Sequence, residues 1–340
     1  MSLKNILVTG GLGFIGSHTV VALHEAGLNP VIVDNLDNTR IEVLDGITEI
    51  TGSKPTFYQF DYRDSAQLVK LLKDEKIDGV IHFAAYKAVG ESVEQPLKYY
   101  DNNVAGFVGL VQLLSKHKVP LIFSSSATVY GSAPELPLVE TAPFSPATNP
   151  YGSTKQICER IIADVTAAGH LRCVVLRYFN PIGAHPSAKI GELPLGTPAN
   201  LIPLTTQATA GVRPFLTVFG TDYDTPDGSA IRDYIHVVDL ADAHVAAIQY
   251  LADDSVRHDI FNVGSGQGNS VLEVIKTFET VNKVKVPYKI GPRRAGDIGA
   301  CYANVDKIKQ MLGWQTKLSL ADGLRDAWRW QQSLGKPAKK

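Results

Sequence analysis

The chain has 340 residues, of which 44% are hydrophobic and 20% charged, with a formal net charge of −1. This balance is typical of a globular protein and argues against a nucleic-acid or anionic-membrane surface. No apolar run approaches the roughly 20 residues of a membrane span, and no cationic leader with a cleavage site begins the chain. We therefore expect neither nucleic acid nor membrane as partner. Three widely spaced cysteines indicate no disulfide framework, so a reducing cytoplasm is the expected location.

The first half of the chain alternates short apolar runs with amphipathic segments. Strands are predicted at residues 5–10, 30–35, 79–85, 120–127 and 172–180, with a further short one at "FYQF". Helices are predicted at residues 14–27, 65–74, 96–117 and 151–168. Continuous apolar strands separated by helices indicate right-handed crossovers and a parallel sheet covered on both faces. The predicted fold class is α/β, with a Rossmann-type doubly wound parallel sheet.

After Pro181 the pattern becomes irregular and rich in Gly and Pro as far as Asp227, and then small α/β segments follow. We expect residues 1–180 to form a nucleotide-binding domain, to which a segment at about 232–262 returns. Residues 181–340 would form mainly a smaller α/β substrate domain. Ligands of open α/β sheets bind beyond the carboxyl ends of the strands, where such insertions lie.

A glycine-rich turn, "TGGLGFIGSH", joins the first strand to the first helix. Gly10, Gly13 and Gly16 allow a tight turn, close approach of a pyrophosphate to the backbone, and close packing of helix on strand. The helix N-terminus then presents free N–H groups to the phosphates. This arrangement predicts a dinucleotide site.

The second strand ends in Asp34, 18 residues after Gly16. A carboxylate there can accept hydrogen bonds from both ribose hydroxyls, and it would repel a 2′-phosphate. NAD is therefore predicted rather than NADP. Asp61, which follows "FYQF", is a candidate partner for the adenine.

Tyr151 and Lys155 in "NPYGSTK" lie four residues apart and therefore on one face of a helix. A phenol with a pKa near ~10 needs a neighbouring cation to act as a base at neutral pH. Lys155 and the positive nicotinamide ring would both stabilise the phenolate. Ser124, Ser126 and Thr128 end a predicted strand, where a hydroxyl can relay a substrate proton to Tyr151.

These motifs together resemble the extended short-chain dehydrogenase/reductase superfamily, and within it the UDP-glucose (UDP-galactose) 4-epimerase family. The resemblance rests on seven stretches that follow one another over nearly the whole chain. They are "TGGLGFIGSH", "VIHFAAYKAVGES", "YYDNNVAG", "FSSSATVYG", "NPYGSTK", "LRYFNPIGAH" and "RDYIHVVDLADAH". The resemblance implies a homodimer that forms through two helices per subunit, which begin near Pro96 and Tyr151.

The resemblance also implies a reaction. Tyr151 would take the proton of the sugar 4′-hydroxyl while C4 is oxidised by tightly bound NAD. The 4-keto sugar would then rotate about its link to the diphosphate and be reduced on its other face. Catalytic roles fall to Tyr151, Lys155, Ser126 and Thr128. The expected cofactor residues are Gly10, Gly13, Phe14, Ile15, Gly16, Asp34, Asn35, Asn38, Asp61, Tyr62, Phe83, Ala84, Lys87, Asn103, Ser124, Tyr151, Lys155 and Tyr178. The expected substrate residues are Lys87, Ser126, Thr128, Tyr151, Asn180, Asn200, Leu201, Leu216, Val218, Phe219, Arg232, Arg294, Asp297 and Cys301.

Within that last set, Arg232 and Arg294 match positions that bind the UDP diphosphate, and the segment from Leu216 to Phe219 would lie along uracil. Asp297 would bind the uridine ribose. Cys301 matches a position that borders the hexose, and in the family it is either a bulky Tyr or a small Cys or Ser. A Cys leaves room for an N-acetyl group, so the resemblance implies UDP-GlcNAc and UDP-GalNAc as further substrates.

Three alternatives share this scaffold. Nucleotide-sugar 4,6-dehydratases carry an Asp-Glu pair where this chain has Ala127 and Thr128, which argues against dehydration. UDP-uronate 4-epimerases and decarboxylases begin with the same oxidation but act on an anionic sugar. A non-catalytic NAD-binding regulatory protein is the third alternative, against which the intact Tyr151 and Lys155 argue. Neither the three widely spaced cysteines nor the histidines show a metal-ligand spacing, so no metal is predicted.

Overall fold

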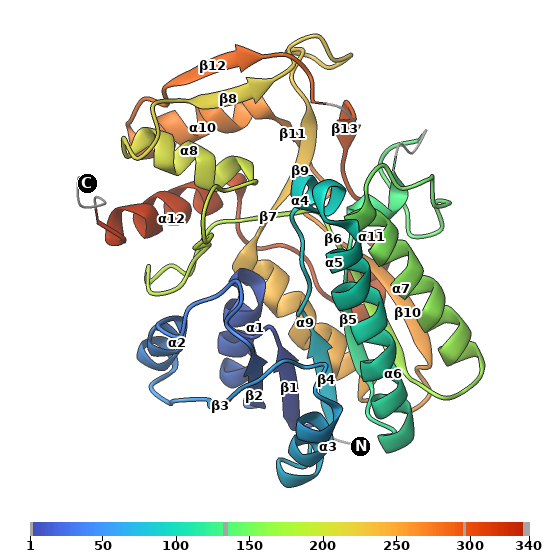
Figure 1. The fold of residues 1–340 in the computed structure, drawn as a ribbon. Helices are drawn as coiled ribbons and strands as arrows, with labels where there is room; N and C mark the ends of the chain where they lie inside the picture. Colours follow the sequence, from blue (N-terminus) through green and yellow to red (C-terminus); the bar gives the residue numbers. More distant parts are fainter. Residues whose placement is uncertain (1–2, 132–134, 295–296, 336–340) are drawn as a thin grey trace.

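The computed structural model describes residues 3–131, 135–294 and 297–335, and its centre is a parallel sheet of seven strands (Figure 1). Across the sheet they are β3 (Thr56–Gln59), β2 (Asn29–Asp34), β1 (Asn5–Thr9), β4 (Gly79–His82), β5 (Leu121–Ser126), β6 (Cys173–Tyr178) and β10 (His258–Val263). All neighbouring strands run parallel. The order reverses between β1 and β4, which opens a crevice beyond their carboxyl ends. This topology confirms the predicted Rossmann-type doubly wound sheet.

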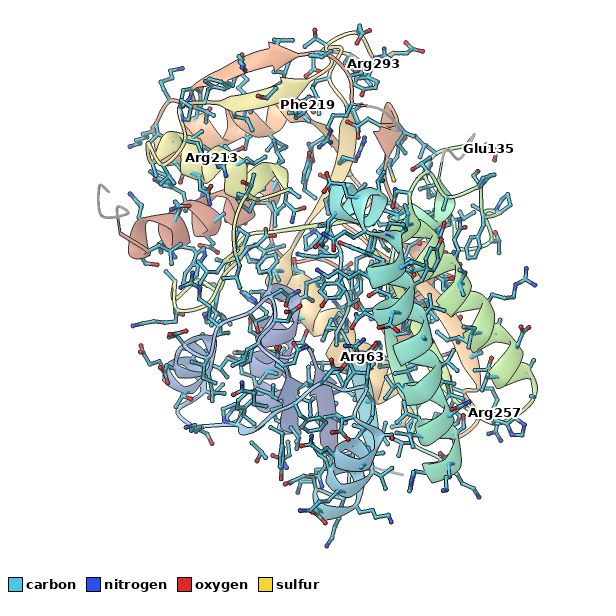
Figure 2. All side chains as sticks on the ribbon, in the orientation of Figure 1. Arg63, Glu135, Arg213, Phe219, Arg257 and Arg293 are labelled. Carbon is cyan, nitrogen blue, oxygen red and sulfur yellow. The ribbon has the colours of Figure 1, made fainter. Side chains whose placement is uncertain are left out.

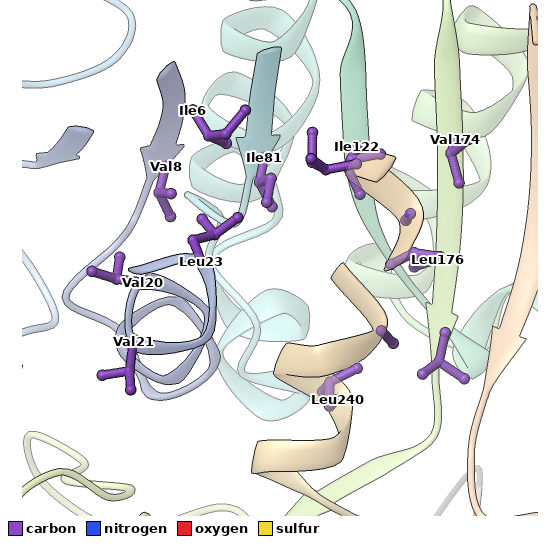
Figure 3. Packing of buried hydrophobic residues seen from close by; sticks show 14 of the residues in the cluster. Ile6, Val8, Val20, Val21, Leu23, Ile81, Ile122, Val174, Leu176 and Leu240 are labelled. Carbon is purple, nitrogen blue, oxygen red and sulfur yellow. The ribbon is translucent and has the colours of Figure 1, made fainter. Parts of the chain in front are cut away.

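Helices cover both faces of the sheet. One layer contains α1 (Phe14–Glu25), α2 (Val43–Thr51) and α9 (Val237–Leu251), and the other contains α3 (Ser65–Asp74), α6 (Gly106–His117) and α7 (Pro150–Ala167). Because side chains alternate along a strand, Ile6 and Val8 pack against α1 and α9 (Figure 3). Leu7 points the other way and packs with residues of α3 and α6. Burial on both faces explains why these strands are apolar throughout.

Several predicted elements end differently in the structure. The strand predicted to reach Ala85 stops at His82, and the one predicted to reach Ala127 stops at Ser126, where the 3₁₀ turn η2 (Ala127–Tyr130) begins. The predicted helix at residues 96–117 consists of α5 (Pro96–Tyr100), the π-helical turn η1 (Asp101–Ala105) and α6, and α4 (Val89–Glu94) precedes it. Such π turns are frequent at functional sites, and η1 faces the loop that follows β4.

The C-terminal part is built from smaller sheets at the upper end of the view in Figure 1. Strands β11 (Gly268–Ser270), β9 (Ile231–His236) and β13 (Ala300–Cys301) form one sheet, with β7 (Asn180–Ile182) paired to β9, while β12 (Tyr288–Gly291) pairs with β8 (Leu216–Phe219). Helices α8 (Leu201–Thr209), α10 (Val271–Asn282) and α12 (Leu320–Ser333) share a core with them. In contrast, α11 (Asp306–Leu312) packs against β10 and α9. The chain thus passes repeatedly between the central sheet and the smaller sheets.

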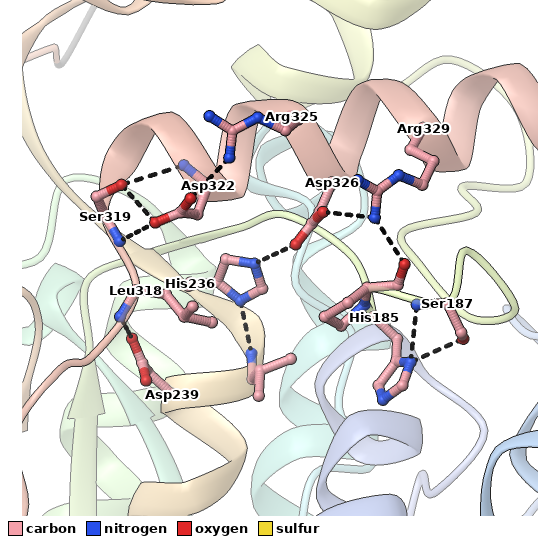
Figure 4. A network of polar contacts seen from close by, with 12 residues as sticks. His185, Ser187, His236, Asp239, Leu318, Ser319, Asp322, Arg325, Asp326 and Arg329 are labelled. Atoms are coloured by element: carbon pink, nitrogen blue, oxygen red, sulfur yellow. Dashed lines mark hydrogen bonds and ion pairs between the residues drawn. The ribbon is translucent and has the colours of Figure 1, made fainter. Parts of the chain in front are cut away.

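Polar contacts tie α12 to the end of β9 and the start of α9 (Figure 4). His236 Nε2 lies 3.3 Å from Asp326 Oδ2, and His236 Nδ1 accepts a hydrogen bond from Val238 N at 3.1 Å. Asp239 Oδ2 accepts a hydrogen bond from Leu318 N at 2.9 Å. The imidazole and both carboxylates are buried, so these contacts fix the small sheets relative to the central one.

Candidate active site

A cavity of about 360 Å³ lies beyond the carboxyl ends of β1, β4 and β5. It collects most of the residues for which the sequence predicts a role. Those that line it are Gly10, Gly13, Phe14, Ile15, Gly16, Asp34, Asn35, Asn38, Tyr62, Phe83, Ala84, Lys87, Ser124, Ser126, Thr128, Tyr151, Lys155, Tyr178, Asn180 and Asn200. The cavity occupies the crevice at which the strand order reverses, where open α/β sheets bind ligands.

The glycine turn leaves no space for side chains. Gly10 has φ +70°, and a Cβ on it would lie 2.8 Å from Ala84 N. A Cβ on Gly16 would lie 2.3 Å from Gly10 O. Gly13 precedes the first turn of α1 without a side-chain cap, so the helix N-terminus opens onto the cavity. The turn therefore provides the bare backbone and the N–H groups that a pyrophosphate needs.

Asp34 is held in one orientation at the end of β2. Its carboxylate accepts hydrogen bonds from Leu12 N at 3.1 Å, from Leu36 N at 3.0 Å and from Thr39 Oγ1 at 2.8 Å. The side chain is buried, yet it lines the cavity. A fixed carboxylate at this place suits a ribose diol and disfavours a 2′-phosphate.

Asp61 is not among the residues that line the cavity. It forms an ion pair with Arg63 at 2.7 Å, and the Arg63 guanidinium holds the pKa of this carboxyl below its usual range. Asn35, which lines the cavity, also donates a hydrogen bond to Asp61. The structure therefore gives Asp61 a contact with the rim of the cavity rather than with its interior.

Helix α7 brings Tyr151 and Lys155 to the end of β5. Asn149 caps the helix by accepting a hydrogen bond from Gly152 N at 2.9 Å, and Tyr151 then lies in the first turn. Burial raises the pKa of the Tyr151 phenol, and a hydrogen bond with Ser126 acts in the opposite direction. Burial therefore outweighs the lowering of this pKa that was expected from Lys155.

Lys155 instead binds the backbone of β5. Its Nζ donates to Ser124 O at 2.6 Å and lies 4.9 Å from the centre of the Phe123 ring. Burial lowers the pKa of Lys155 to about 8. The ammonium is thus anchored beside the cavity with a pKa close to neutrality, as suits a group that assists proton transfer.

Thr128 provides a direct test of whether the cavity fits a ligand. Within the described residues its buried Oγ1 has no hydrogen-bond partner, and its side chain lines the cavity beside Ser126 and Tyr151. An unpaired buried hydroxyl is costly unless a ligand supplies a partner. Together with the glycine turn and Asp34, it makes the cavity a good fit for NAD and for a second ligand that carries a hydrogen-bonding group.

Three of the expected cofactor residues have contacts that the sequence did not predict. The Tyr178 hydroxyl is hydrogen-bonded to His244 Nε2. Lys87 Nζ lies 3.6 Å from Glu192 Oε1. Asn103 does not line the cavity, because its amide binds Tyr86 N at 3.0 Å and Tyr86 O at 2.9 Å. Asn103 therefore shapes the loop after β4.

Several of the expected nucleotide-binding residues lie on or beside β8, whose last residue, Phe219, is labelled near the top of Figure 2. Arg294 forms an ion pair with Asp297 at 2.8 Å and lies 4.9 Å from the centre of the Phe219 ring. Leu216 and Val218 point into the core because strand residues alternate. At these two positions the strand can therefore offer uracil only its backbone, and the predicted contact of this segment with uracil stays a prediction.

Arg232, Leu201 and Cys301 also lie outside the cavity lining. Arg232 Nη1 donates to Ile231 O at 2.8 Å, and Leu201 packs against the core of the small sheets. Cys301 is buried in a cluster with Tyr130 and Phe179, and burial raises the pKa of its thiol to about 11. Since Phe179 lines the cavity, Cys301 is one side chain removed from it.

Several cavity residues were not predicted from the sequence. They are Val33, Asp37, Thr39, Phe60, Ala85, Tyr86, Val89, Asn102, Ser125, Phe179 and Pro181. The run of turn-forming residues after Asp34 could have predicted that Thr39 lines the cavity. No local feature of the sequence predicts the same for Tyr86. Its position depends on Asn103, which lies 17 residues later in the chain. Within the described ranges, no group of three or more His, Cys, Asp or Glu side chains could hold a metal ion.

A glycine turn on β1, an acid at the end of β2, and a Tyr–Lys pair facing the hydroxyls of β5 define a dinucleotide-dependent enzyme of the short-chain dehydrogenase/reductase type. Comparison with known proteins narrows this class. A family model described as GDP-mannose 4,6 dehydratase matches residues 7–327. UDP-glucose 4-epimerases from Neisseria meningitidis serogroup A and Bacillus subtilis are 50% and 49% identical to the chain, each over 96% of it and 97% of the relative.

Solved structures show the same likeness. The UDP-glucose 4-epimerase of Stenotrophomonas maltophila, with bound NAD and formylated UDP-arabinopyranose, has a TM-score of 0.95 and 48% identity over 97% of this chain and 98% of that one. That of Bifidobacterium longum, in complex with NAD+ and UDP, has a TM-score of 0.93 and 46% identity with the same coverage. The UDP-Glc/GlcNAc 4-epimerase of Campylobacter jejuni has a TM-score of 0.83 and 35% identity over 97% and 99%. The chain belongs to the UDP-glucose 4-epimerase family.

Proposed function

We propose that this chain is an NAD-dependent isomerase that interconverts UDP-galactose and UDP-glucose through a transient 4-keto sugar. The observation that carries the proposal is the meeting of Tyr151, Ser126 and Thr128 in one cavity with the glycine turn, with the Thr128 hydroxyl lacking a hydrogen-bond partner among the residues that the structure describes. When bound, NAD supplies the reversible oxidation of the sugar C4 and a positive ring beside the phenol. Family membership and the epimerase relatives support the same reaction.

The chain's own groups bind the sugar and move one proton. The Ser126 and Thr128 hydroxyls hold the 4′-hydroxyl of the sugar, and Tyr151 takes its proton directly or through Ser126. Lys155 stabilises the phenolate from its anchor on Ser124 O. The proton returns by the same route when the opposite face of the keto sugar is reduced.

The cofactor and the nucleotide have separate sets of candidate residues. The glycine turn, Asp34, Asn35 and Tyr178 would hold NAD, since all line the cavity. Arg294, Asp297 and the face of Phe219 would hold UDP, because they lie together next to β8. Asn180 and Asn200 lie on the cavity wall and would bind the sugar and the diphosphate between them.

A second substrate pair, UDP-GalNAc and UDP-GlcNAc, is proposed from Cys301. Its small side chain packs behind Phe179 on the cavity wall. A bulky residue at this position would push the wall inward, while a Cys leaves volume next to the sugar. This extends the proposed function rather than replacing it.

We also propose a homodimer formed through α4, α5 and α7. Val93, Leu97 and Ile157 are 62%, 81% and 38% exposed, and the three helices contact one another. Apolar side chains gathered on neighbouring helices are typical of a protein–protein interface. Sedimentation of the purified chain tests this assembly.

A cytoplasmic location is in keeping with three free, buried cysteines. No helix in the described part of the chain is both long and apolar enough to cross a membrane.

The test of the function is incubation of the purified protein with UDP-galactose, then with UDP-GalNAc, without added cofactor. Conversion to the C4 epimer of each is expected. Formation of a dehydrated sugar would contradict the proposal. Failure with both, followed by turnover of a UDP-uronate, would identify the uronate alternative, and no turnover at all would favour a binding protein.

A further inference from the structure

A bidentate ion pair is buried behind the active site, between α7 and β6. Arg177 Nη2 lies 2.6 Å from Glu159 Oε2, and Arg177 Nε donates to both carboxylate oxygens at 3.1 Å. Each side chain is 3% exposed. The proposed reaction uses neither residue directly.

Glu159 extends the face of α7 that carries the reacting groups. It follows Tyr151 by eight residues and Lys155 by four, so the three side chains lie along one side of the helix. Its Oε1 accepts a hydrogen bond from Ser125 Oγ. Ser125 lies between Ser124, which binds Lys155, and Ser126, which is hydrogen-bonded to Tyr151. The carboxylate thus fixes α7 to β5 at the level of the reaction.

Arg177 extends the contact to the turn that carries Thr128. It lies opposite Ser125 in the pairing of β5 with β6. Its Nη1 donates to Tyr130 Oη at 2.9 Å, and Tyr130 Oη donates to Asn262 Oδ1 at 2.5 Å. Tyr130 is fully buried and ends η2, two residues after Thr128. The guanidinium therefore determines where this hydroxyl-bearing turn lies.

The network continues to the strand of Cys301. Asn262 Nδ2 donates to Leu138 O at 2.8 Å, and the same oxygen accepts from Asn304 N at 2.7 Å. Leu138 N donates to Tyr302 O at 2.9 Å. One connected set of buried polar groups thus joins α7, β5, η2 and the residues directly after Cys301.

We propose that Glu159 and Arg177 are positioning residues for the epimerisation, which hold Tyr151 and Lys155 in register with the Ser126 and Thr128 hydroxyls. The inference rests on the proposed function. Replacing a buried ion pair by apolar groups is often neutral or stabilising, so fold stability alone does not explain this one. Its two-pronged geometry instead fixes both distance and angle between helix and strand, and misplacement of a reacting group by 1 Å can lower a rate ~100-fold.

The experiment measures kcat and KM for UDP-galactose, bound NAD and the melting temperature of Glu159→Gln, which keeps the shape of the side chain and removes its charge. Glu279→Gln serves as the matched control, since Glu279 forms an exposed ion pair with Lys285 at 3.1 Å. We expect kcat of Glu159→Gln to fall at least ~10-fold, with KM and bound NAD within about twofold of wild type. The control should keep its kcat.

Glu159→Asp gives a second route to the same answer if the Gln variant does not fold. It retains the charge but shortens the side chain, so a positioning role predicts a similar fall in kcat with NAD retained. A kcat within twofold of wild type in either folded variant, whatever its melting temperature, overturns the proposal. A loss of bound NAD, or a KM that rises by the same factor as kcat falls, also overturns the proposal. Absence of epimerisation by the wild-type protein would instead refute the proposed function.

Discussion

Lys155 Nζ donates to the carbonyl oxygen of Ser124 at 2.6 Å, so the ammonium that is proposed to stabilise the phenolate also links α7 to β5. Lys155→Met keeps much of the side-chain volume and removes both functions. We expect kcat for UDP-galactose to fall by about 10²–10⁴, the usual contribution of a group that assists proton transfer. Steady-state kinetics with NAD content measured in parallel checks this. Retention of wild-type kcat would contradict the role given to Lys155.

Tyr151→Phe removes only the hydroxyl that is proposed, as the phenolate, to accept the sugar proton. Because the ring remains, the cavity keeps its shape, and binding of NAD and UDP-sugar should stay within a few-fold of wild type. Turnover should be abolished. Calorimetric titration with UDP together with an assay for UDP-glucose distinguishes the two effects. Near-normal epimerisation by this variant would exclude Tyr151 as the base.

Gly16→Ala tests the close packing of the glycine turn. The new Cβ would lie 2.3 Å from Gly10 O, and overpacking of this kind costs about 1–3 kcal/mol in unfolding free energy. The purified variant should also carry less NAD. The matched control is Gly109→Ala in α6, where the added Cβ has no atom within 4 Å and should stabilise the helix by up to about 1 kcal/mol. Equal NAD content in both variants would argue against a tight pyrophosphate turn.

Cys301→Tyr tests the volume behind Phe179. We expect the variant to lose at least ~10-fold in kcat/KM for UDP-GalNAc, in the range that a single pocket group commands, while UDP-galactose is affected much less. Cys301→Ser has nearly the same volume and should keep the wild-type ratio of the two. If the Tyr variant kept that ratio as well, Cys301 would have no part in sugar selection.

Three buried histidines predict how stability depends on pH. Burial lowers the pKa of His18 and His82 to about 3 and that of His244 to about 4, whereas an unfolded chain has a histidine pKa near ~6.5. Below that pH the unfolded state binds protons that the folded state does not. The free energy of unfolding should therefore decrease as the pH is lowered. The three histidines together contribute up to about 4 kcal/mol per pH unit to this decrease near pH 5.

Urea denaturation between about pH 7.5 and pH 5 measures this slope. A single substitution, His82→Gln, should reduce this slope by up to about 1.4 kcal/mol per pH unit, because one proton is then no longer taken up on unfolding. A flat profile over the same range would mean that these side chains already accept protons in the folded protein.

The sequence predicted the parts of the site that are local. The turn from Gly10 to Gly16, Asp34 at a strand end, and the helical pair Tyr151 and Lys155 each lie within one short stretch of sequence, and all of them line the cavity. The glycine spacing and the apolar strands likewise predicted the central sheet, because hydrophobic periodicity is itself a local property.

What the sequence could not provide is which way a side chain points once distant segments meet. Leu216 and Val218 were assigned to the nucleotide, but packing of β8 against the core determines which face of that strand is exposed. Asn103 was expected to bind the cofactor, but in the structure its side-chain amide binds the backbone of Tyr86 in the loop after β4. The partnership of Glu159 and Arg177 joins a helix to a strand, and neither residue alone suggests it.

Strand β10 completes the edge of the central sheet beside β6, although residues 179–257 separate them and include the strands β7, β8 and β9 of the smaller sheets. During synthesis, the edge of β6 therefore stays open until residue 263 has left the ribosome. A sheet edge left open in this way invites wrong pairing. We therefore expect a chain that ends before β10 to be prone to aggregation, because its β6 edge has no partner strand.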